Sequence, residues 1–267
     1  MRLVITHSTR YTFDEPVVAN LQQVRLTPGP SSTQTISSWD LEIEGGHIEV
    51  HFDDQHGNRV HLVRATVGTT GLAINCTGEV QTHSRGGAAA RHGDLTPLWL
   101  YRRQTALTRP GPAIREIALG FDESIARDVA AVHALSASIR ESVSYEIGAT
   151  TVIATAEEAL VAGAGVCQDH AHIFISAARS LGLPARYVSG YLMMDDRVDQ
   201  DATHAWAEAW VEELGWVGFD ISNSISPDER YVHIARGLDY REAAPVAGIR
   251  TGRGGEHLNV GLQVQQQ

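Results

Sequence analysis

Cys167 is the residue of this sequence best placed to do chemistry, because it begins a segment with the pattern of an amphipathic helix. The apolar residues of this segment recur at helical spacing, at Ala171, Phe174, Ile175, Ala178 and Leu181. A thiol in the first turn of a helix lies near unpaired N–H groups and the positive end of the helix dipole. Both favour the thiolate, which is the reactive form of cysteine. Gly163 and Gly165 would let a substrate approach the backbone closely. Cys167 is therefore a candidate nucleophile.

His204 and Asp220 could complete this chemistry. They fall on neighbouring strands predicted over residues 204–211 and 216–221, which a turn at 212–215 joins into a hairpin. We expect the helix that begins at Cys167 to cover this sheet, and the spacing permits the three side chains to meet. If they do, Asp220 would orient His204, and His204 would take the proton from Cys167 and later deliver it to a leaving group.

Three other residues are candidates for substrate contacts. The backbone N–H of Cys167 is the natural first donor of an oxyanion hole, and the side chains of Gln168 and Tyr145 are candidates for the second donor. Trp206 alternates with His204 along one strand, so it could form a wall of the acyl-binding cleft or belong to the core.

A metal site is the alternative interpretation of this region, because Asp169, His170 and His172 follow Cys167 closely. The spacing argues against it, since on a helix His172 points away from the side that Cys167 and His170 share. The sequence also contains no Cys-x-x-Cys or His-Glu-x-x-His motif. We therefore expect no metal ion and no cofactor.

Residues 1–83 show the pattern of a β-rich domain. Short alternating segments are separated by turn formers, and they predict strands over residues 2–7, 21–27, 36–43, 47–53, 60–67 and 72–80. Cys76 lies on the last of these and is expected to be a packed side chain. The Gly-rich segment 84–94 is the predicted linker, and residues 95–267 are assigned to a catalytic domain with a C-terminal extension.

The second part of the chain shows helical patterns before Cys167. Apolar spacing predicts one helix that Asp122 caps and that reaches Val143. Residues 155–158 have the form of a capping box, and Gly163 should end the helix that follows. After a strand predicted over 185–192, the segment 193–202 contains four Asp residues and reads as a polar loop that could gate the cleft.

Composition limits the classes of partner. The chain has 43% hydrophobic and 20% charged residues, which is typical of a folded globular protein. Its net charge of −11 disfavours nucleic acid as a partner. The N-terminus lacks the apolar stretch of a signal peptide and no segment is long enough to span a membrane, so we expect a cytoplasmic protein without a membrane partner. All 21 basic residues are arginines, and a disulfide is not expected.

Four ordered blocks resemble the core of the transglutaminase-like superfamily. They are GVCQDHAH at residues 165–172, ARYVSGY at 185–191, THAW at 203–206 and GWVGFD at 215–220. The β-rich first part, including HSTRYTF at residues 7–13, is similar to the N-terminal domain that accompanies this core in bacterial members. The resemblance implies a papain-like α+β fold, in which a helix bearing the nucleophile Cys167 packs on an antiparallel sheet bearing the base His204 and the orienting Asp220.

The resemblance leaves the reaction open, because the family includes cross-linking transglutaminases, peptidases and amidases. We favour a cysteine peptidase or amidase that acts on a peptide or amide substrate through a thioester. A cross-linking enzyme must keep water away, and the 193–202 loop offers no apolar lid. The alternatives are a protein-glutamine cross-linking transglutaminase and a non-catalytic peptide-binding or scaffold protein. The complete set of Cys167, His204 and Asp220 speaks against the scaffold, since binding alone does not need all three.

Overall fold

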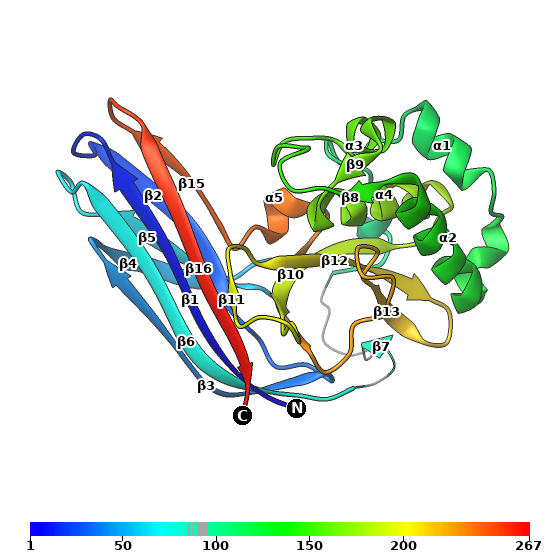
Figure 1. The fold of residues 1–267 in the computed structure, drawn as a ribbon, viewed down its shortest axis with the longest axis horizontal. Coiled ribbons are helices and arrows are strands. Elements are labelled where there is room, and N and C mark those ends of the chain that lie inside the picture. The colour runs from blue at the N-terminus through cyan, green and yellow to red at the C-terminus, as the bar shows by residue number, and fades with distance from the viewer. Residues whose placement is uncertain (85, 87, 90–95) are drawn as a thin grey trace.

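The computed structural model describes residues 1–84, 86, 88–89 and 96–267, in which a β-sandwich lies beside a helix-covered sheet (Figure 1). The expected α+β fold is confirmed, because helices and antiparallel sheets share the chain. Among the described helices, none is long and apolar enough to cross a membrane.

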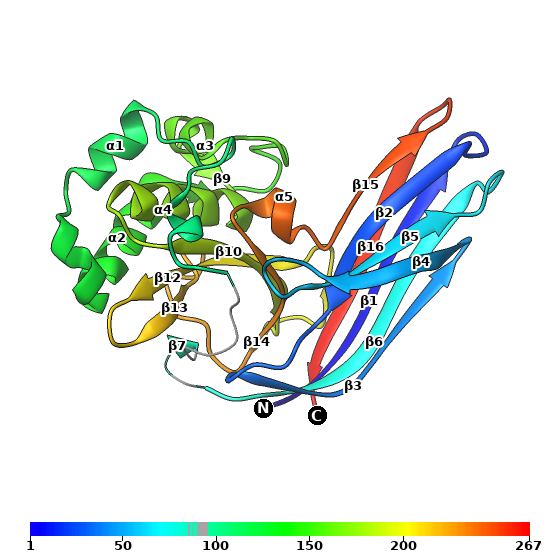
Figure 2. The same cartoon turned by 180° about the vertical axis from the view of Figure 1, so that it is seen from behind.

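The sandwich contains all six strands predicted from residues 1–83. One sheet has the order β11-β16-β1-β6-β3 and the other, seen from behind in Figure 2, has the order β15-β2-β5-β4. Alternate residues of β1, such as Leu3 and Ile5, point between the sheets and are buried there. The strands are β1 (Arg2–Phe13), β2 (Ala19–Thr27), β3 (Gln34–Glu44), β4 (Gly46–Asp53), β5 (Arg59–Ala65), β6 (Gly71–Thr82), β11 (Asp199–Gln200), β15 (Val246–Thr251) and β16 (Glu256–Gln266).

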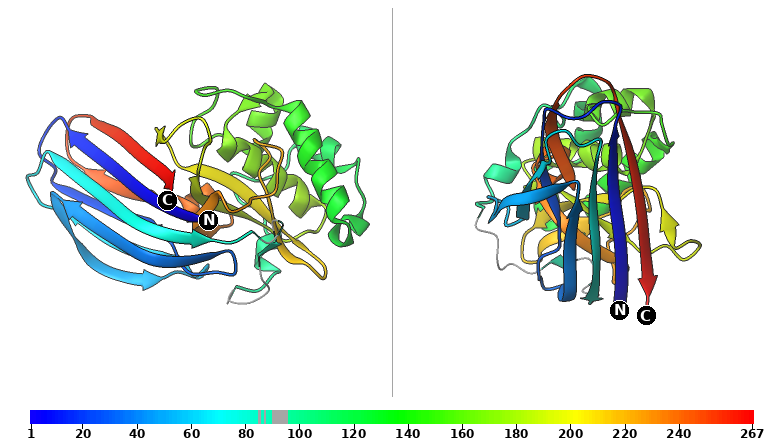
Figure 3. Two further views of the ribbon diagram at one scale, coloured as in Figure 1. Left: turned by 60° about the horizontal axis from the view of Figure 1, so that its bottom comes forward. Right: turned by 90° about the vertical axis from the view of Figure 1, so that its left-hand side faces the viewer.

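The C-terminal strands belong to the sandwich, which the sequence did not predict. β16 pairs with β1 along its whole length, from Leu3 opposite Gln266 to Phe13 opposite Glu256, and β15 pairs with β2. The two chain ends therefore lie side by side (Figure 3). The sequence analysis assigned residues 95–267 to one catalytic domain with an extension and did not predict this pairing. Pairing between strands about 250 residues apart leaves no local signal in the sequence.

The helix-covered sheet has the order β14-β10-β12-β13-β7, and all its pairs are antiparallel. Its strands are β7 (Ala88–Ala89), β10 (Ala185–Leu192), β12 (His204–Val211), β13 (Gly215–Phe219) and β14 (Tyr231–Gly237). Most of the predicted linker 84–94 lies outside the described residues, but β7 falls within that range and pairs with β13. The predicted hairpin of β12 and β13 is confirmed.

Helices cover one face of this sheet (Figure 1). They are α1 (Pro112–Ala118), α2 (Val129–Ser142), α3 (Ala156–Ala162) and α4 (Cys167–Ser180). The remaining elements are the short helix α5 (Tyr240–Ala243), the 3-10 turns η1 (Leu100–Arg102) and η2 (Glu123–Arg127), and the small strands β8 (Ser144–Tyr145) and β9 (Ala164–Gly165). The helix that was predicted to open at Cys167 is thus confirmed as α4.

Small side chains let α4 approach the sheet closely. β12 presents Ala205, Ala207 and Ala209 to the core that α4 shares, and the ring of Phe174 in α4 stacks on Phe219 of β13 with centroids 5.1 Å apart. Nearly the whole of α4 after its first turn is buried. The helix that carries Cys167 is therefore fixed against the strand that begins at His204.

The helix predicted from Asp122 to Val143 is broken in two. Asp122 caps η2 by accepting from the Ser124 N–H at 2.8 Å, and Asp128 caps α2 by accepting from the Ala130 N–H at 2.9 Å. The second Asp interrupts the helix because its carboxylate takes the place of a backbone acceptor. The capping box at residues 155–158 is confirmed, and α3 ends at Gly163 with a φ of 67°.

We predict that β16 contributes to folding through its buried face. Leu262 is 2% exposed in the sandwich core, so Leu262→Ala should lower the free energy of unfolding by about 2–5 kcal/mol. Leu258 lies on the same strand and is 56% exposed, so Leu258→Ala is a matched control that should change it by less than about 0.5 kcal/mol. Denaturant unfolding measures both, and equal effects would contradict the packing of β16 in the sandwich.

Candidate active site

Cys167 lies in the first turn of α4, as predicted, and its residue is partly exposed. The carboxylate of Asp169 holds this turn, because its Oδ2 accepts from the Val166 N–H at 2.8 Å and from the Thr150 hydroxyl at 2.6 Å. A Cβ at position 165 would lie 2.8 Å from the Cβ of Asp169, so Gly165 leaves room for this cap. The thiol is thus presented at a fixed helix start.

His204 and Asp220 form a short hydrogen bond. The Nε2 of His204 lies 2.6 Å from Oδ2 of Asp220, and both residues are buried. Asp220 directly follows β13, and His204 is the first residue of β12, so the hairpin brings them together. Since Nε2 is engaged by Asp220, Nδ1 is the ring nitrogen left for the thiol of Cys167, which lines the same cavity as His204. The structure therefore brings the three predicted residues together.

The charge of this group follows from its contacts. Burial lowers the pKa of His204, but the hydrogen bond to Asp220 and the interaction with the Cys167 sulfur outweigh it and raise the pKa to about 10. Burial also raises the pKa of Asp220, but its hydrogen bonds from His204, Asn223 and Tyr231 outweigh that effect and lower the pKa. An imidazolium and a carboxylate therefore face each other at neutral pH.

Asp220 has two further partners that the sequence analysis did not identify. The Nδ2 of Asn223 donates to Oδ2 of Asp220 at 2.7 Å and its backbone N–H donates to Oδ1 at 3.2 Å, while the Tyr231 hydroxyl donates to Oδ2 at 2.7 Å. Asn223 could have been found from its position in a turn three residues after Asp220. Tyr231 arrives on β14 and has no such local signal.

Two cavities meet at His204. The thiol cavity, with a volume of about 490 Å³, is lined by Cys167 and His204, and the side cavity, with about 630 Å³, is lined by His204 and Tyr231. Both cavities are also lined by Tyr145, Ile147, Met194 and Arg197. The two cavities therefore share His204 and these walls.

The candidates for substrate contacts have different positions. Tyr145 is 46% exposed and lines both cavities. Gln168 also lines the thiol cavity, but its Nε2 donates to the Val152 carbonyl at 3.1 Å, so that amide group is already engaged. Trp206 is only 3% exposed, lines neither cavity, and packs edge-on against Tyr231 with centroids 5.4 Å apart. Of the two roles considered for Trp206, the structure therefore shows the core position.

The polar residues after Cys167 have separate partners. His170 lies 2.8 Å from the Ser222 hydroxyl through Nδ1 and 3.2 Å from the Val143 carbonyl through Nε2. His172 accepts from the Tyr240 N–H at 3.1 Å, and burial lowers its pKa to about 3. These side chains therefore fix α4 to its surroundings and do not converge with Cys167.

The polar segment 193–202 is held at one end by the sandwich. β11 lies within it and pairs with β16, with Asp199 opposite Gln263 and Gln200 opposite Leu262. The side chain of Gln200 is buried and donates to the Leu192 carbonyl at 2.9 Å. This wall of the two cavities therefore has a defined position, which the sequence did not indicate.

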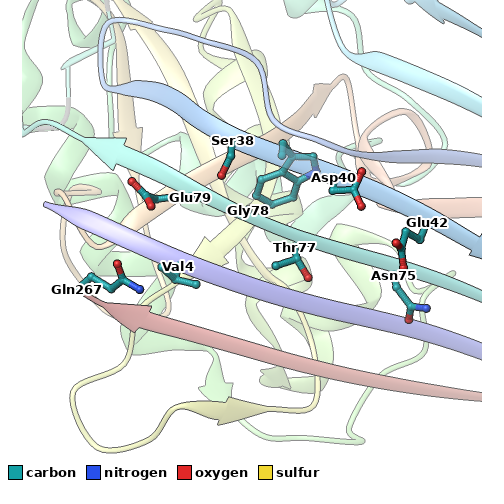
Figure 4. A pocket seen from close by; sticks show the side chains of 10 residues that line it. Val4, Ser38, Asp40, Glu42, Asn75, Thr77, Gly78, Glu79 and Gln267 are labelled. Carbon is teal, nitrogen blue, oxygen red and sulfur yellow. The ribbon is translucent and has the colours of Figure 1, made fainter.

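A third hollow, of about 600 Å³, lies on the outer face of the sandwich above Gly78 (Figure 4). Its walls carry the carboxylates of Asp40, Glu42 and Glu79, and Glu79 is already paired with Arg2 at 2.5 Å. None of the residues that line it is a cysteine or a histidine. The nucleophile and the base belong to the cavities around His204.

Comparison with known proteins agrees with this geometry. Residues 115–221 match the transglutaminase-like superfamily, and residues 3–81 match the bacterial transglutaminase-like N-terminal region. An uncharacterized protein of Mycobacterium tuberculosis is 30% identical over 275 residues, which cover 93% of this chain and 87% of that protein. The chain belongs to the transglutaminase-like superfamily, and the resemblance expected from the four sequence blocks is confirmed.

Two further relatives describe the range of the family. A solved structure from Cytophaga hutchinsonii, which bears the name "putative cysteine protease", covers 99% of this chain and 98% of its own with a TM-score of 0.72 and 21% identity. It shows the same fold. A protein-glutamine gamma-glutamyltransferase of Pseudomonas aeruginosa is 29% identical over 97 residues, which cover 32% of this chain and 14% of that protein. The family match supports a cysteine-based enzyme.

We predict that Cys167 is alkylated far faster than Cys76. Burial, with the charge of Asp40 adding to it, raises the pKa of the Cys76 thiol to about 12, whereas Cys167 is partly exposed beside an imidazolium. Mass spectrometric mapping of iodoacetamide adducts on the folded protein at neutral pH measures this. Faster labelling of Cys76 would contradict the assignment of the nucleophile.

Proposed function

We propose that this protein is a thiol-dependent amide hydrolase, a cysteine peptidase or amidase, that uses Cys167, His204 and Asp220 as a catalytic triad. The observation that carries the proposal is the 2.6 Å contact between His204 and Asp220 beside a thiol at a helix start. Binding alone does not need a nucleophile, a base and an orienting carboxylate in one place, which disfavours the non-catalytic scaffold.

The arrangement supports a two-step reaction. The Cys167 sulfur attacks the carbonyl carbon of the amide, the C–N bond breaks, and the imidazolium of His204 gives its proton to the leaving nitrogen. A thioester remains. His204 then takes a proton from water, the resulting hydroxide attacks the thioester, and the C–S bond breaks to release the acid. Asp220 keeps the imidazole oriented through both steps.

The negative oxygen formed in each step needs hydrogen-bond donors. The backbone N–H of Cys167 is one, because the first N–H groups of a helix have no partner within it. Tyr145 is the second candidate, since its ring lines both cavities and remains half exposed. Gln168 is less suited to this role because one of its two side-chain N–H groups binds the Val152 carbonyl and holds the amide there.

Water is the favoured acceptor of the acyl group. The side cavity is lined by Asp195 and Asp196, whose side chains are 79% and 71% exposed, and by Arg197 and Arg230. These charged groups keep the approach to His204 hydrated. Amine transfer is the second candidate, because the same carboxylates would attract a cationic amine and the Pseudomonas relative is named as a glutamyltransferase.

A partition experiment tests the proposal. A peptide amide incubated with the purified protein should release free acid, and a primary amine at millimolar concentration should change this release little. Cys167→Ala is the control, which should abolish turnover and leave the melting temperature close to that of the wild type. The chain contains no lysine, so self-cross-linking through lysine side chains cannot complicate the result.

Two outcomes of this experiment would contradict the proposal. Amine incorporation at the expense of free acid would return the assignment to a transglutaminase. Undiminished turnover by Cys167→Ala would exclude the thiol mechanism.

A further inference from the structure

Two amide side chains of the sandwich form hydrogen bonds to the outer edge of β14. β14 is the edge strand of the helix-covered sheet on the side nearest the sandwich (Figure 2). Gln34 donates through Nε2 to the His233 carbonyl at 2.9 Å and accepts the His233 N–H at 3.0 Å. Asn58 repeats this pattern at Arg236, accepting its N–H at 2.8 Å and donating to its carbonyl at 2.7 Å. Each amide therefore replaces a peptide group of a neighbouring strand.

Both amides are rigidly held in the sandwich. Gln34 is 1% exposed and its Nε2 also donates to the Gly29 carbonyl. The Nδ2 of Asn58 donates to Asp54 as well, whose other oxygen accepts the Asn58 N–H. Preorganised partners of this kind fix position at little cost in side-chain entropy.

Apolar contacts add to the same attachment. Val232 and Ile234 of β14 are buried in the sandwich core, and the Thr82 hydroxyl donates to the Glu229 carbonyl just before the strand. Hydrogen bonds to the N–H and C=O groups of a strand hold it closely in place, because they weaken steeply away from their preferred distance and angle. β14 pairs with β10 on its other side, where Leu192 lies opposite Tyr231. The two amides therefore fix β14 from the side of the sandwich.

β14 begins at Tyr231, whose hydroxyl donates to Asp220. Only Val232 separates Tyr231 from the residue that Gln34 binds. We infer that the sandwich is a positioning domain for the triad: Gln34 and Asn58 fix β14, and β14 holds the Tyr231 hydroxyl on the carboxylate that orients His204. Tyr231, Gln34 and Asn58 are then positioning residues, and the inference rests on the proposed thiol mechanism.

Steady-state kinetics and thiol reactivity of the full-length protein test this inference. Tyr231→Phe removes one donor to a buried carboxylate and keeps the ring, so kcat should fall on the order of tenfold while KM stays within about twofold. Gln34→Ala with Asn58→Ala should lower kcat in the same way. The amides are inferred to act through Tyr231. When Gln34→Ala and Asn58→Ala are combined with Tyr231→Phe, the fold loss of kcat should therefore be much smaller than the product of the separate losses.

The matched control is Gln22→Ala. Gln22 is another buried amide of the sandwich, and it donates to Asn20 rather than to β14. It should leave kcat unchanged even if the melting temperature falls. If the double variant does not fold, the single variants Gln34→Ala and Asn58→Ala carry the test, because each leaves the other amide on β14, and each should lower kcat by less than the pair.

Fully multiplicative effects, or an equal loss of kcat in Gln22→Ala, would overturn the inference, because the sandwich would then act only through stability. The rate of iodoacetamide alkylation of Cys167 gives a second readout that needs no substrate. This rate should fall in the variants of Tyr231, Gln34 and Asn58, and it should not fall in Gln22→Ala. A wild-type protein without thiol-dependent turnover would refute the proposed function, and the alkylation series would still decide the positioning role.

Discussion

Asp220 is a buried carboxylate, and the arrangement of the site depends on how its charge is stabilised. A buried charge is tolerated only when it is paired and hydrogen-bonded. Oδ2 of Asp220 accepts from His204, Asn223 and Tyr231, which come from β12, the turn after β13 and β14. Three separate parts of the helix-covered sheet must therefore keep their register for one oxygen to remain satisfied.

The position of the thiol depends on a second constraint, the close packing of α4 on β12. The alternating alanines of β12 let the helix approach, and Asp169 caps its first turn beside Gly165. The same strand that admits the helix begins with His204. Packing of small side chains thus sets the distance between the base and Cys167, while hydrogen bonding at Asp220 sets the orientation of the base.

The predictability of the site and the fold follows from the range of the interactions. Cys167, His204 and Asp220 could be selected from the sequence because a helix start, a strand start and a hairpin are local patterns, and because these residues fall in blocks that resemble a known family. The early strands and the capping box at Thr155 were equally local. Tyr231 and the partners of β16 could not be found in this way, since they meet residues far along the chain. The sequence left two roles open for Trp206 because alternation along a strand does not say which face lines a cavity.

The protonation state of His204 tests this account most directly. The account predicts that His204 remains an imidazolium through neutral pH, because Asp220 and the Cys167 sulfur raise its pKa to about 10 in spite of burial. Isotope-edited NMR of the imidazole nitrogens, with the signal assigned by its loss in His204→Gln, measures this pKa, and Asp220→Asn should lower it. A wild-type His204 that titrates near the ordinary value of about 6.5, or that does not respond to Asp220→Asn, would contradict the account.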